Sequence, residues 1–207
     1  MKNRISVIVF DLGNVLIPFD YNRLIVKMNS IDDGLGSRFA KLYYDNYNVH
    51  QSYERWQLSD NEFIKIMLDW TEHKISEEEF KFIYSDLFTE NKATTAILPG
   101  LKQRYKLVLL SNTNYIHQKY GWRKYNFLQH FDKLILSHEV GFIKPEKEIY
   151  KAVEEFTQEP SENHIFIDDI LEYVEGAKKL GWRGIQFKSH KQLINDFKLF
   201  DIKINDN

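Results

Sequence analysis

The sequence has no cysteine among its 207 residues. Disulfide bridges, thiolate metal sites and cysteine nucleophiles are therefore excluded, and the composition fits a reducing compartment, so we expect a cytoplasmic protein. The sequence has only nine glycines and four prolines, and it contains no low-complexity tract or internal repeat. It also lacks any apolar run near the roughly 20 residues of a membrane span, and the apolar run near its beginning is too short for a signal peptide. We therefore expect no membrane partner.

An excess of charge of one sign is also absent. The 28 basic and 30 acidic residues leave a net charge of -2. No global basic field indicates a nucleic acid or an anionic membrane surface as a partner. The length fits one domain, or one domain with an inserted subdomain, and it is sufficient for a sizeable core.

The first feature that the sequence does have is an apolar run that ends in an aspartate. Residues Val7–Phe10 lead directly into Asp11, and Gly13 follows two positions later. A short apolar run bounded by a turn signal predicts a buried strand of a parallel sheet. Asp11 is then at the carboxyl end of that strand, where open α/β sheets bind their ligands. A helix cap or a turn explains Asp11 equally well when this stretch is taken alone.

Two patterns follow along the chain. Between residues 20 and 93 the apolar residues have helical spacing, Ser59 and Ser76 begin two capping boxes, and Gly34 and Gly36 predict a loop. From residue 94 onward, apolar runs at 106–110, 133–137, 164–167 and 184–187 alternate with helical patterns, including one helix over 95–104 that Pro99 interrupts. Such alternation predicts right-handed βαβ units. The predicted fold class is therefore α/β, a Rossmann-like doubly wound parallel sheet formed by residues 1–19 and 94–207, with an all-helical insert at 20–93.

Polar residues gather where these predicted strands end. They are Asp11, Ser111–Asn112, Lys144 (after a strand and a turn) and Asp168–Asp169. Each one alone is explained by a helix cap or by solvated surface, but in a parallel sheet all four groups lie at one edge. Carboxylates are suitable ligands for Mg²⁺, a lysine neutralises phosphate, and a serine with backbone amides holds phosphate oxygens. A carboxylate can also attack phosphorus, so the pattern favours phosphoryl transfer.

Four segments carry a resemblance to a known family. Asp11–Val15, Leu110–Asn114, Gly141–Pro145 and Ile167–Asp169 resemble, in this order, the four motifs of the haloacid dehalogenase-like (HAD) hydrolase superfamily. The resemblance covers the whole chain, and the insert is similar to the small helical cap of that superfamily. Within the superfamily, the sequence is most similar to the glucose-1-phosphatase-like members, which share Asp-Leu-Gly-Asn-Val and Ser-Asn-Thr-Asn.

The resemblance implies a role for each matching position. Asp11 matches the nucleophile, and Lys144 pairs with it as a second catalytic group. The implied Mg²⁺ ligands are Asp11, the carbonyl of Gly13, Asp169 and, as a further ligand, Asp168. The implied contacts to the phosphate and the substrate come from Ser111, Asn112, Gly13, Asn14 and Arg55.

Gly13 is a departure from the family pattern. Most phosphatases of this superfamily have there an aspartate that protonates the leaving group and then activates water, and losing such a group costs about 10²–10⁴-fold in rate. Three explanations remain open. The duty falls to another group such as Glu54 or a histidine of the cap, the substrate has a leaving group that needs little help, or catalysis has weakened.

The function that we expect is a Mg²⁺-dependent phosphatase acting on a small phosphorylated metabolite, with a sugar phosphate as the favoured class. One alternative is a 2-haloacid dehalogenase-type hydrolase, in which the same aspartate attacks carbon without a metal. The adjacent Asp168 and Asp169 argue against it, because clustered carboxylates repel one another unless a cation lies between them. A second alternative is a phosphate-binding protein whose catalysis has decayed, as Gly13 suggests. The sequence leaves the oligomeric state open between monomer and homodimer.

Overall fold

The computed structural model describes residues 4–204, and its centre is a five-stranded parallel sheet in the order β3-β2-β1-β4-β5. The strands are β1 (Val7–Phe10), β2 (Lys106–Ser111), β3 (Lys133–Leu136), β4 (His164–Asp168) and β5 (Arg183–Gln186). The predicted fold class is confirmed. Because β1 is the middle strand, the residue that follows it lies at the centre of one sheet edge.

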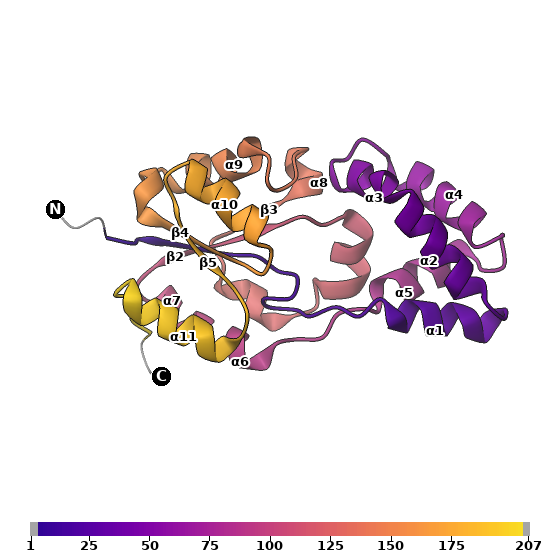
Figure 1. Ribbon diagram of the computed structural model, residues 1–207, viewed down its shortest axis with the longest axis horizontal. Helices are drawn as coiled ribbons and strands as arrows, with labels where there is room; N and C mark the ends of the chain where they lie inside the picture. Colours follow the sequence, from indigo (N-terminus) through magenta and orange to yellow (C-terminus); the bar gives the residue numbers. More distant parts are fainter. Residues whose placement is uncertain (1–3, 205–207) are drawn as a thin grey trace.

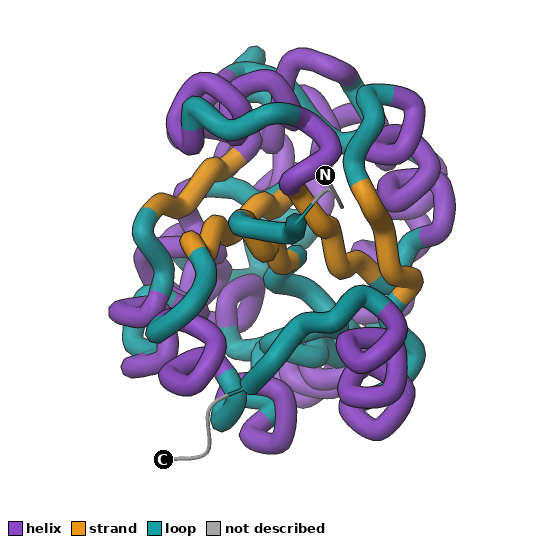
Figure 2. The backbone as a smooth tube through the Cα atoms, turned by 90° about the vertical axis from the view of Figure 1, so that its left-hand side faces the viewer, coloured by secondary structure: helices purple, strands orange, loops and turns teal. Residues whose placement is uncertain are grey.

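Both faces of the sheet are covered by helices, which explains the continuous apolar character of the strands. Alternate strand residues point to opposite faces, so Ile8 and Phe10 belong to one apolar cluster, whereas Val7 and Val9 belong to another. The first cluster includes residues of α7 (Leu98–Lys102) and α11 (His190–Leu199). The second includes residues of α9 (Lys147–Thr157) and α10 (Leu171–Lys179). Figures 1 and 2 show these helices on the two sides of the strands.

Five helices between β1 and β2 form a separate packing unit, the helical cap. They are α1 (Asn22–Ile31), α2 (Leu35–Asp45), α3 (Tyr47–Glu54), α4 (Asp60–Trp70) and α5 (Glu77–Ser85). Their buried faces meet in a cluster of their own that includes Phe39, Phe63 and Phe80. Both predicted capping boxes, at Ser59 and Ser76, are confirmed. Figure 1 places these helices beyond the carboxyl ends of the strands, which leaves the sheet edge facing the cap.

Two chain segments that lie side by side connect the cap to the core. Phe19 and Phe88 form an isolated antiparallel bridge. The Asp20 amide donates to the Leu87 carbonyl at 3.1 Å, and the Thr89 amide donates to the Pro18 carbonyl at 2.9 Å. The chain therefore enters and leaves the cap at one place. The domain limits at 19/20 and 93/94 stay a prediction.

The predicted loop at Gly34 and Gly36 is only half right. Gly34 has a left-handed conformation (φ 72°) directly before α2, but Gly36 lies within α2. A Cβ atom on Gly36 would be 2.2 Å from the carbonyl oxygen of Ile25 in α1. Gly36 is therefore needed for the close approach of two helices, which neighbouring sequence does not reveal.

The helices and turns between strands also differ in detail from the prediction. The helix expected over 95–104 is two short helices, α6 (Lys92–Thr95) and α7, with Pro99 in the first turn of α7. A π-helix (His117–Trp122), two 3-10 helices (Asn126–His130 and Ser161–Asn163) and the short α8 (Ser137–Val140) complete the described chain. Across residues 4–204, no helix combines the length and apolar character that crossing a membrane requires.

Candidate active site

The polar groups predicted at the strand ends come together at the sheet edge beneath the cap. Asp11 directly follows β1, and Asp168 is the last residue of the neighbouring β4, with Phe10 and Ile167 in register. The Lys144 ammonium donates to Asp11 Oδ1 at 2.6 Å and to Asp168 Oδ2 at 2.7 Å. All three side chains are buried. The parallel register of the strands thus creates a buried ion-pair network from residues more than 130 positions apart in the chain.

A third carboxylate joins this network. Asp11, Asp168 and Asp169 each have an oxygen within 4.8 Å of the others. The backbone of Asn14 is left-handed (φ 53°), and its side-chain amide donates to Asp169 Oδ2 at 3.1 Å. Asp168 Oδ1 accepts from the Ile170 amide at 2.8 Å. Asn14, expected at the substrate, therefore holds one of the acidic groups in position.

The charges of this cluster do not balance. Three carboxylates face one ammonium, which leaves two negative charges in excess when all are ionised. Burial raises the pKa of Asp11 to about 7, the Lys144 ammonium opposes the rise, and Asp168 adds to it. Burial also raises the pKa of Asp169, against its hydrogen bond from Asn14. For Lys144, burial lowers the pKa, but the two adjacent carboxylates together raise it above its ordinary value. Closely spaced hard oxygen ligands with excess negative charge fit a divalent cation such as Mg²⁺.

Asn112 fixes the backbone that carries the lysine. Its side-chain oxygen accepts from the Lys144 amide at 2.7 Å, and its side-chain nitrogen donates to the Lys144 carbonyl at 3.2 Å. Ser111, the last residue of β2, is buried at the same edge and donates to the Asn112 carbonyl at 3.3 Å. Both residues line the cavity described below. The Asn112 side chain is thus occupied by the Lys144 backbone, whereas contact of either residue with a phosphate stays a prediction.

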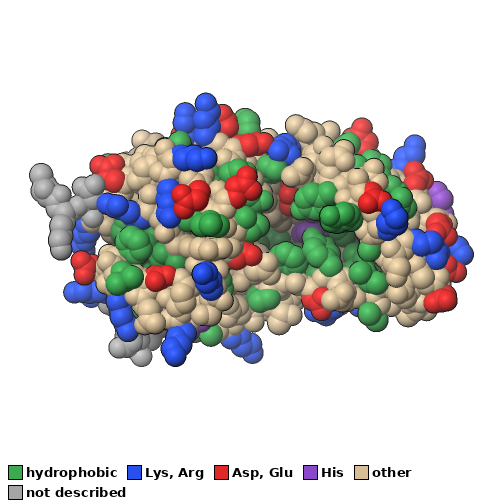
Figure 3. All heavy atoms as spheres, in the orientation of Figure 1, with side chains coloured by type: hydrophobic (Ala, Val, Ile, Leu, Met, Phe, Trp, Pro, Cys, Tyr) green, Lys and Arg blue, Asp and Glu red, His purple; other side chains and the backbone are tan. Residues whose placement is uncertain are grey.

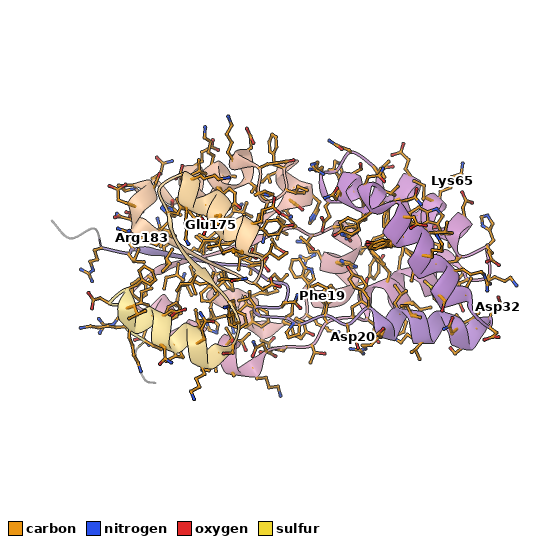
Figure 4. All side chains as sticks on the ribbon, viewed as in Figure 1. Phe19, Asp20, Asp32, Lys65, Glu175 and Arg183 are labelled. Carbon is orange, nitrogen blue, oxygen red and sulfur yellow. The ribbon has the colours of Figure 1, made fainter. Side chains whose placement is uncertain are left out.

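The space beside Gly13 is already filled. A Cβ atom at this position would lie 3.2 Å from the ring of Phe19, which is tighter than ordinary van der Waals contact. Figure 4 places Phe19 between the sheet and the cap helices. The Gly13 carbonyl accepts from the Val15 amide at 2.6 Å, so a metal bond from this oxygen stays a prediction. A side chain at position 13 would require the aromatic ring to shift by a few tenths of an ångström.

A cavity of about 150 Å³ separates the acidic cluster from the cap. The core contributes Asp11, Ser111, Lys144 and Asp169 to its wall, and the cap and its connections contribute Phe19, Tyr21, Tyr47, His50, Glu54 and Phe88. In Figure 3 the hollow between the two parts of the molecule is bordered by hydrophobic side chains, with a histidine visible inside. The site therefore has a charged floor and a mostly aromatic roof.

Arg55 is not among the residues that line this cavity, and its contact with the substrate stays a prediction. Its guanidinium donates twice to Glu146 Oε1, at 3.1 Å from Nε and 2.7 Å from Nη2. The carboxylate of Glu146 also accepts from the Ile143 amide at 2.9 Å. Arg55 thus connects the end of α3 to the loop that carries Lys144.

The cap residues that do line the cavity were mostly missed by the sequence analysis. Glu54 was considered, and so was a cap histidine without a position, but Tyr47 and Tyr21 were not. His50 and Glu54 have the i, i+4 spacing that places two side chains on one helix face, and this signal could have found the pair. Nothing local in the sequence indicates that Tyr21 faces the sheet edge.

Comparison with known proteins agrees with this geometry. Residues 5–181 match the family model described as "Hydrolase: haloacid dehalogenase-like hydrolase". The chain belongs to the haloacid dehalogenase-like hydrolase family. It is an enzyme of the HAD type, and its four motifs meet at one edge of the sheet, although the strands lie in the order β3-β2-β1-β4-β5.

Three relatives illustrate the similarity to other HAD proteins. The chain is 28% identical over 88% of its length to D-ribitol-5-phosphate phosphatase of Bacteroides thetaiotaomicron, covering 91% of that protein. It is 27% identical over 80% of its length to a phosphorylated carbohydrates phosphatase of Thermotoga maritima, covering 85% of it. A solved HAD family enzyme of Bacteroides thetaiotaomicron, in complex with magnesium and inorganic phosphate, superposes with a TM-score of 0.78 at 28% identity, over 89% of this chain and 94% of that one.

Proposed function

We propose that this HAD enzyme is a Mg²⁺-dependent phosphatase that hydrolyses a small phosphorylated sugar or sugar alcohol through an aspartyl-phosphate on Asp11. The observation that carries the proposal is the acidic cluster with its single buried lysine, Lys144. The names of the relatives, which specify ribitol 5-phosphate and phosphorylated carbohydrates, support the substrate class. The similar solved enzyme binds magnesium and inorganic phosphate, which supports Mg²⁺ as the metal and phosphate as the released product.

Each residue of the site has its own role in the proposed reaction. Asp11, Asp168 and Asp169 would hold Mg²⁺, which supplies charge neutralisation at the phosphate when it is bound. One carboxylate oxygen of Asp11 attacks phosphorus in line with the departing oxygen. The Lys144 ammonium stabilises Asp11 as a carboxylate and offsets negative charge on the phosphate. The aromatic roof keeps bulk solvent away from the reacting atoms.

The cluster also weighs against the dehalogenase alternative. Attack on carbon needs no metal, and without one the excess negative charge of Asp11, Asp168 and Asp169 has no counterion within the described residues apart from Lys144. The fate of water distinguishes the two reactions. Water attacks phosphorus in a phosphatase, but it attacks the Asp11 carbonyl carbon in a dehalogenase.

The first experiment tests activity and metal together. Wild type should hydrolyse sugar and polyol phosphates and 4-nitrophenyl phosphate only with Mg²⁺, and Asp11→Asn should abolish all turnover. Added Mg²⁺ should raise the thermal midpoint of wild type, since a ligand at about 100 times its Kd stabilises by about 2.7 kcal/mol. Asp169→Asn should reduce that rise, whereas the surface variant Asp32→Asn should not.

Labelled water identifies the reaction path. Turnover in H₂¹⁸O should place the label in phosphate and leave the Asp11 peptide unlabelled by mass spectrometry. Label in the Asp11 carboxylate, or activity that persists in Asp11→Asn, would contradict the proposal.

A further inference from the structure

The cavity contains a carboxylate that the proposed chemistry does not yet use. Glu54 is the last residue of α3 and lines the cavity from the cap, with only 7% of its surface exposed. A carboxylate in the last turn lies at the negative end of the helix dipole, which destabilises its charged form. Helix stability therefore does not explain a glutamate at this position, and a chemical role could explain it.

A buried histidine holds this carboxylate. His50 Nε2 lies 3.1 Å from Glu54 Oε1, one helical turn away, and both side chains are buried. On the other side of the ring, Nδ1 lies 2.5 Å from the Tyr43 hydroxyl and 3.1 Å from the Tyr84 hydroxyl. While Glu54 is ionised it only accepts, so His50 then donates from Nε2, and Nδ1 accepts from a tyrosine. A protonated Glu54 can still accept from Nε2 through its unprotonated oxygen. No hydrogen bond from residues 4–204 is recorded to the second oxygen of Glu54.

The connection of α3 to the core places Glu54 at the catalytic cavity. Arg55, the next residue, is bonded to Glu146 beside the Lys144 loop. The end of α3 is thereby held at the rim of the catalytic cavity. Asp11 lies on the core side of that cavity and Glu54 on the cap side. Because attack by Asp11 is in line, the departing oxygen leaves on the side away from Asp11, toward the cap.

The other titratable groups at the cavity wall are poorly suited to proton transfer. Both ring nitrogens of His117 are engaged, with Asn114 and with the Tyr84 carbonyl, and burial lowers its pKa to about 3. Burial raises the pKa of Tyr21 to about 12. Burial also raises the pKa values of Tyr47 and Tyr173. Asp169 belongs to the acidic cluster, and Gly13 has no side chain.

We propose that Glu54, positioned by His50, is the general acid and base of this enzyme. It lies in the cap and takes the role of the aspartate that most family members have at the position of Gly13. The inference rests on the proposed phosphatase function. In the first step Asp11 Oδ bonds to phosphorus, the bond from phosphorus to the leaving oxygen breaks, and the proton of Glu54 goes to that oxygen. In the second step Glu54 takes a proton from water, the water oxygen bonds to phosphorus, and the bond from phosphorus to Asp11 breaks. Inorganic phosphate and a protonated Glu54 result, so the cycle closes.

Leaving-group dependence tests this role. Glu54→Gln keeps the size of the side chain but has no proton to give. With Mg²⁺ present, its kcat/KM for an alkyl ester such as ribitol 5-phosphate should fall about 10²–10⁴-fold, and for 4-nitrophenyl phosphate it should stay within about threefold, because nitrophenolate needs no proton. The ratio kcat/KM covers only the steps through departure of the leaving group, so slow hydrolysis of the phosphoenzyme does not enter it.

The second step has a separate readout. With 4-nitrophenyl phosphate, Glu54→Gln should release a rapid burst of nitrophenolate equal to the number of active sites and then turn over slowly, because water is no longer activated. His50→Gln should show the same substrate dependence with a smaller loss. Tyr47→Phe is the matched control, since it changes the same cavity wall without removing a carboxylate, and it should affect both esters alike.

Three results would overturn the role of Glu54. They are equal losses of kcat/KM with both esters, no loss with either, and a loss seen only as a higher KM for ribitol 5-phosphate, which would make Glu54 a hydroxyl contact. In each case Asp11→Asn remains inactive and wild type remains active, so the phosphatase proposal survives. A wild type that hydrolyses neither ester removes both proposals.

Discussion

At the scale of single residues, the space left by neighbouring side chains determines which groups can stand at each position of the site. Asp11 and Lys144 were found from sequence because their chemical types follow apolar runs, and their contact at 2.6 Å matches that expectation. The ring of Phe19 beside Gly13 could not be found in this way, because it depends on how the chain turns after β1. The absence of an aspartate at position 13 is therefore coupled to a bulky neighbour, and restoring the aspartate alone should not restore the family pattern.

Gly13→Asp tests this coupling. The new side chain requires the Phe19 ring to shift and adds a carboxylate beside Asp11, so we expect a loss of about 1–3 kcal/mol in the free energy of unfolding. Urea denaturation measures it. Gly13→Asp in a Phe19→Ala background should lose less than the sum of the single changes, because the steric conflict is gone. Additive losses would show that Phe19 does not limit this position.

At the scale of elements, specific side-chain contacts join the cap to the core. The ion pair between Arg55 and Glu146 joins the end of α3 to the start of α9, next to the loop that carries Lys144. Sequence predicted the helices themselves well, because capping boxes and apolar spacing are local signals. It did not reveal the ion pair of Arg55, because the partner is 91 residues away, and it placed Gly36 in a loop because the close approach of α1 and α2 is a tertiary contact.

Arg55→Gln should loosen this link without damaging the chemistry. The pair is partly exposed, so the expected cost in the free energy of unfolding is about 0–1 kcal/mol. Amide hydrogen exchange in α3 should become faster, while exchange in β1 and β4 should stay as in wild type. Turnover of 4-nitrophenyl phosphate should change less than about fivefold, since loss of a charged substrate contact would cost about 10²-fold or more. A loss of that size would support the predicted contact between Arg55 and the substrate.

At the scale of the whole molecule, buried histidines make the free energy of unfolding depend on pH. Burial lowers the pKa of His117 to about 3, and the neighbouring His50 adds to the effect. Burial also lowers the pKa values of His138 and His164. The unfolded chain therefore binds more protons than the folded chain between the ordinary histidine value of 6.5 and the lowered values. Stability from this source is complete above that range and decreases as the pH falls.

His117→Asn should make the protein less sensitive to acid. Wild type should lose up to about 1.4 kcal/mol per pH unit from this one group on acidification below about pH 6. We expect the difference in the free energy of unfolding between wild type and variant to shrink between pH 7.5 and pH 5, measured by urea denaturation. His73→Asn changes an exposed histidine and serves as the surface control. A difference that stays constant with pH would contradict a neutral His117 in the folded state.

The paired chain segments at Phe19 and Phe88 have a consequence for how such enzymes acquire different substrates. Because the chain departs and returns through adjacent hydrogen-bonded positions, the covalent connections of the cap to the core lie at one place. Exchanging that segment for one from a relative leaves the strand register and the acidic cluster untouched, while it replaces the roof of the cavity. The fold can therefore acquire a new substrate preference by a modular swap, and under the proposal made for Glu54 the same swap would carry the proton donor with it.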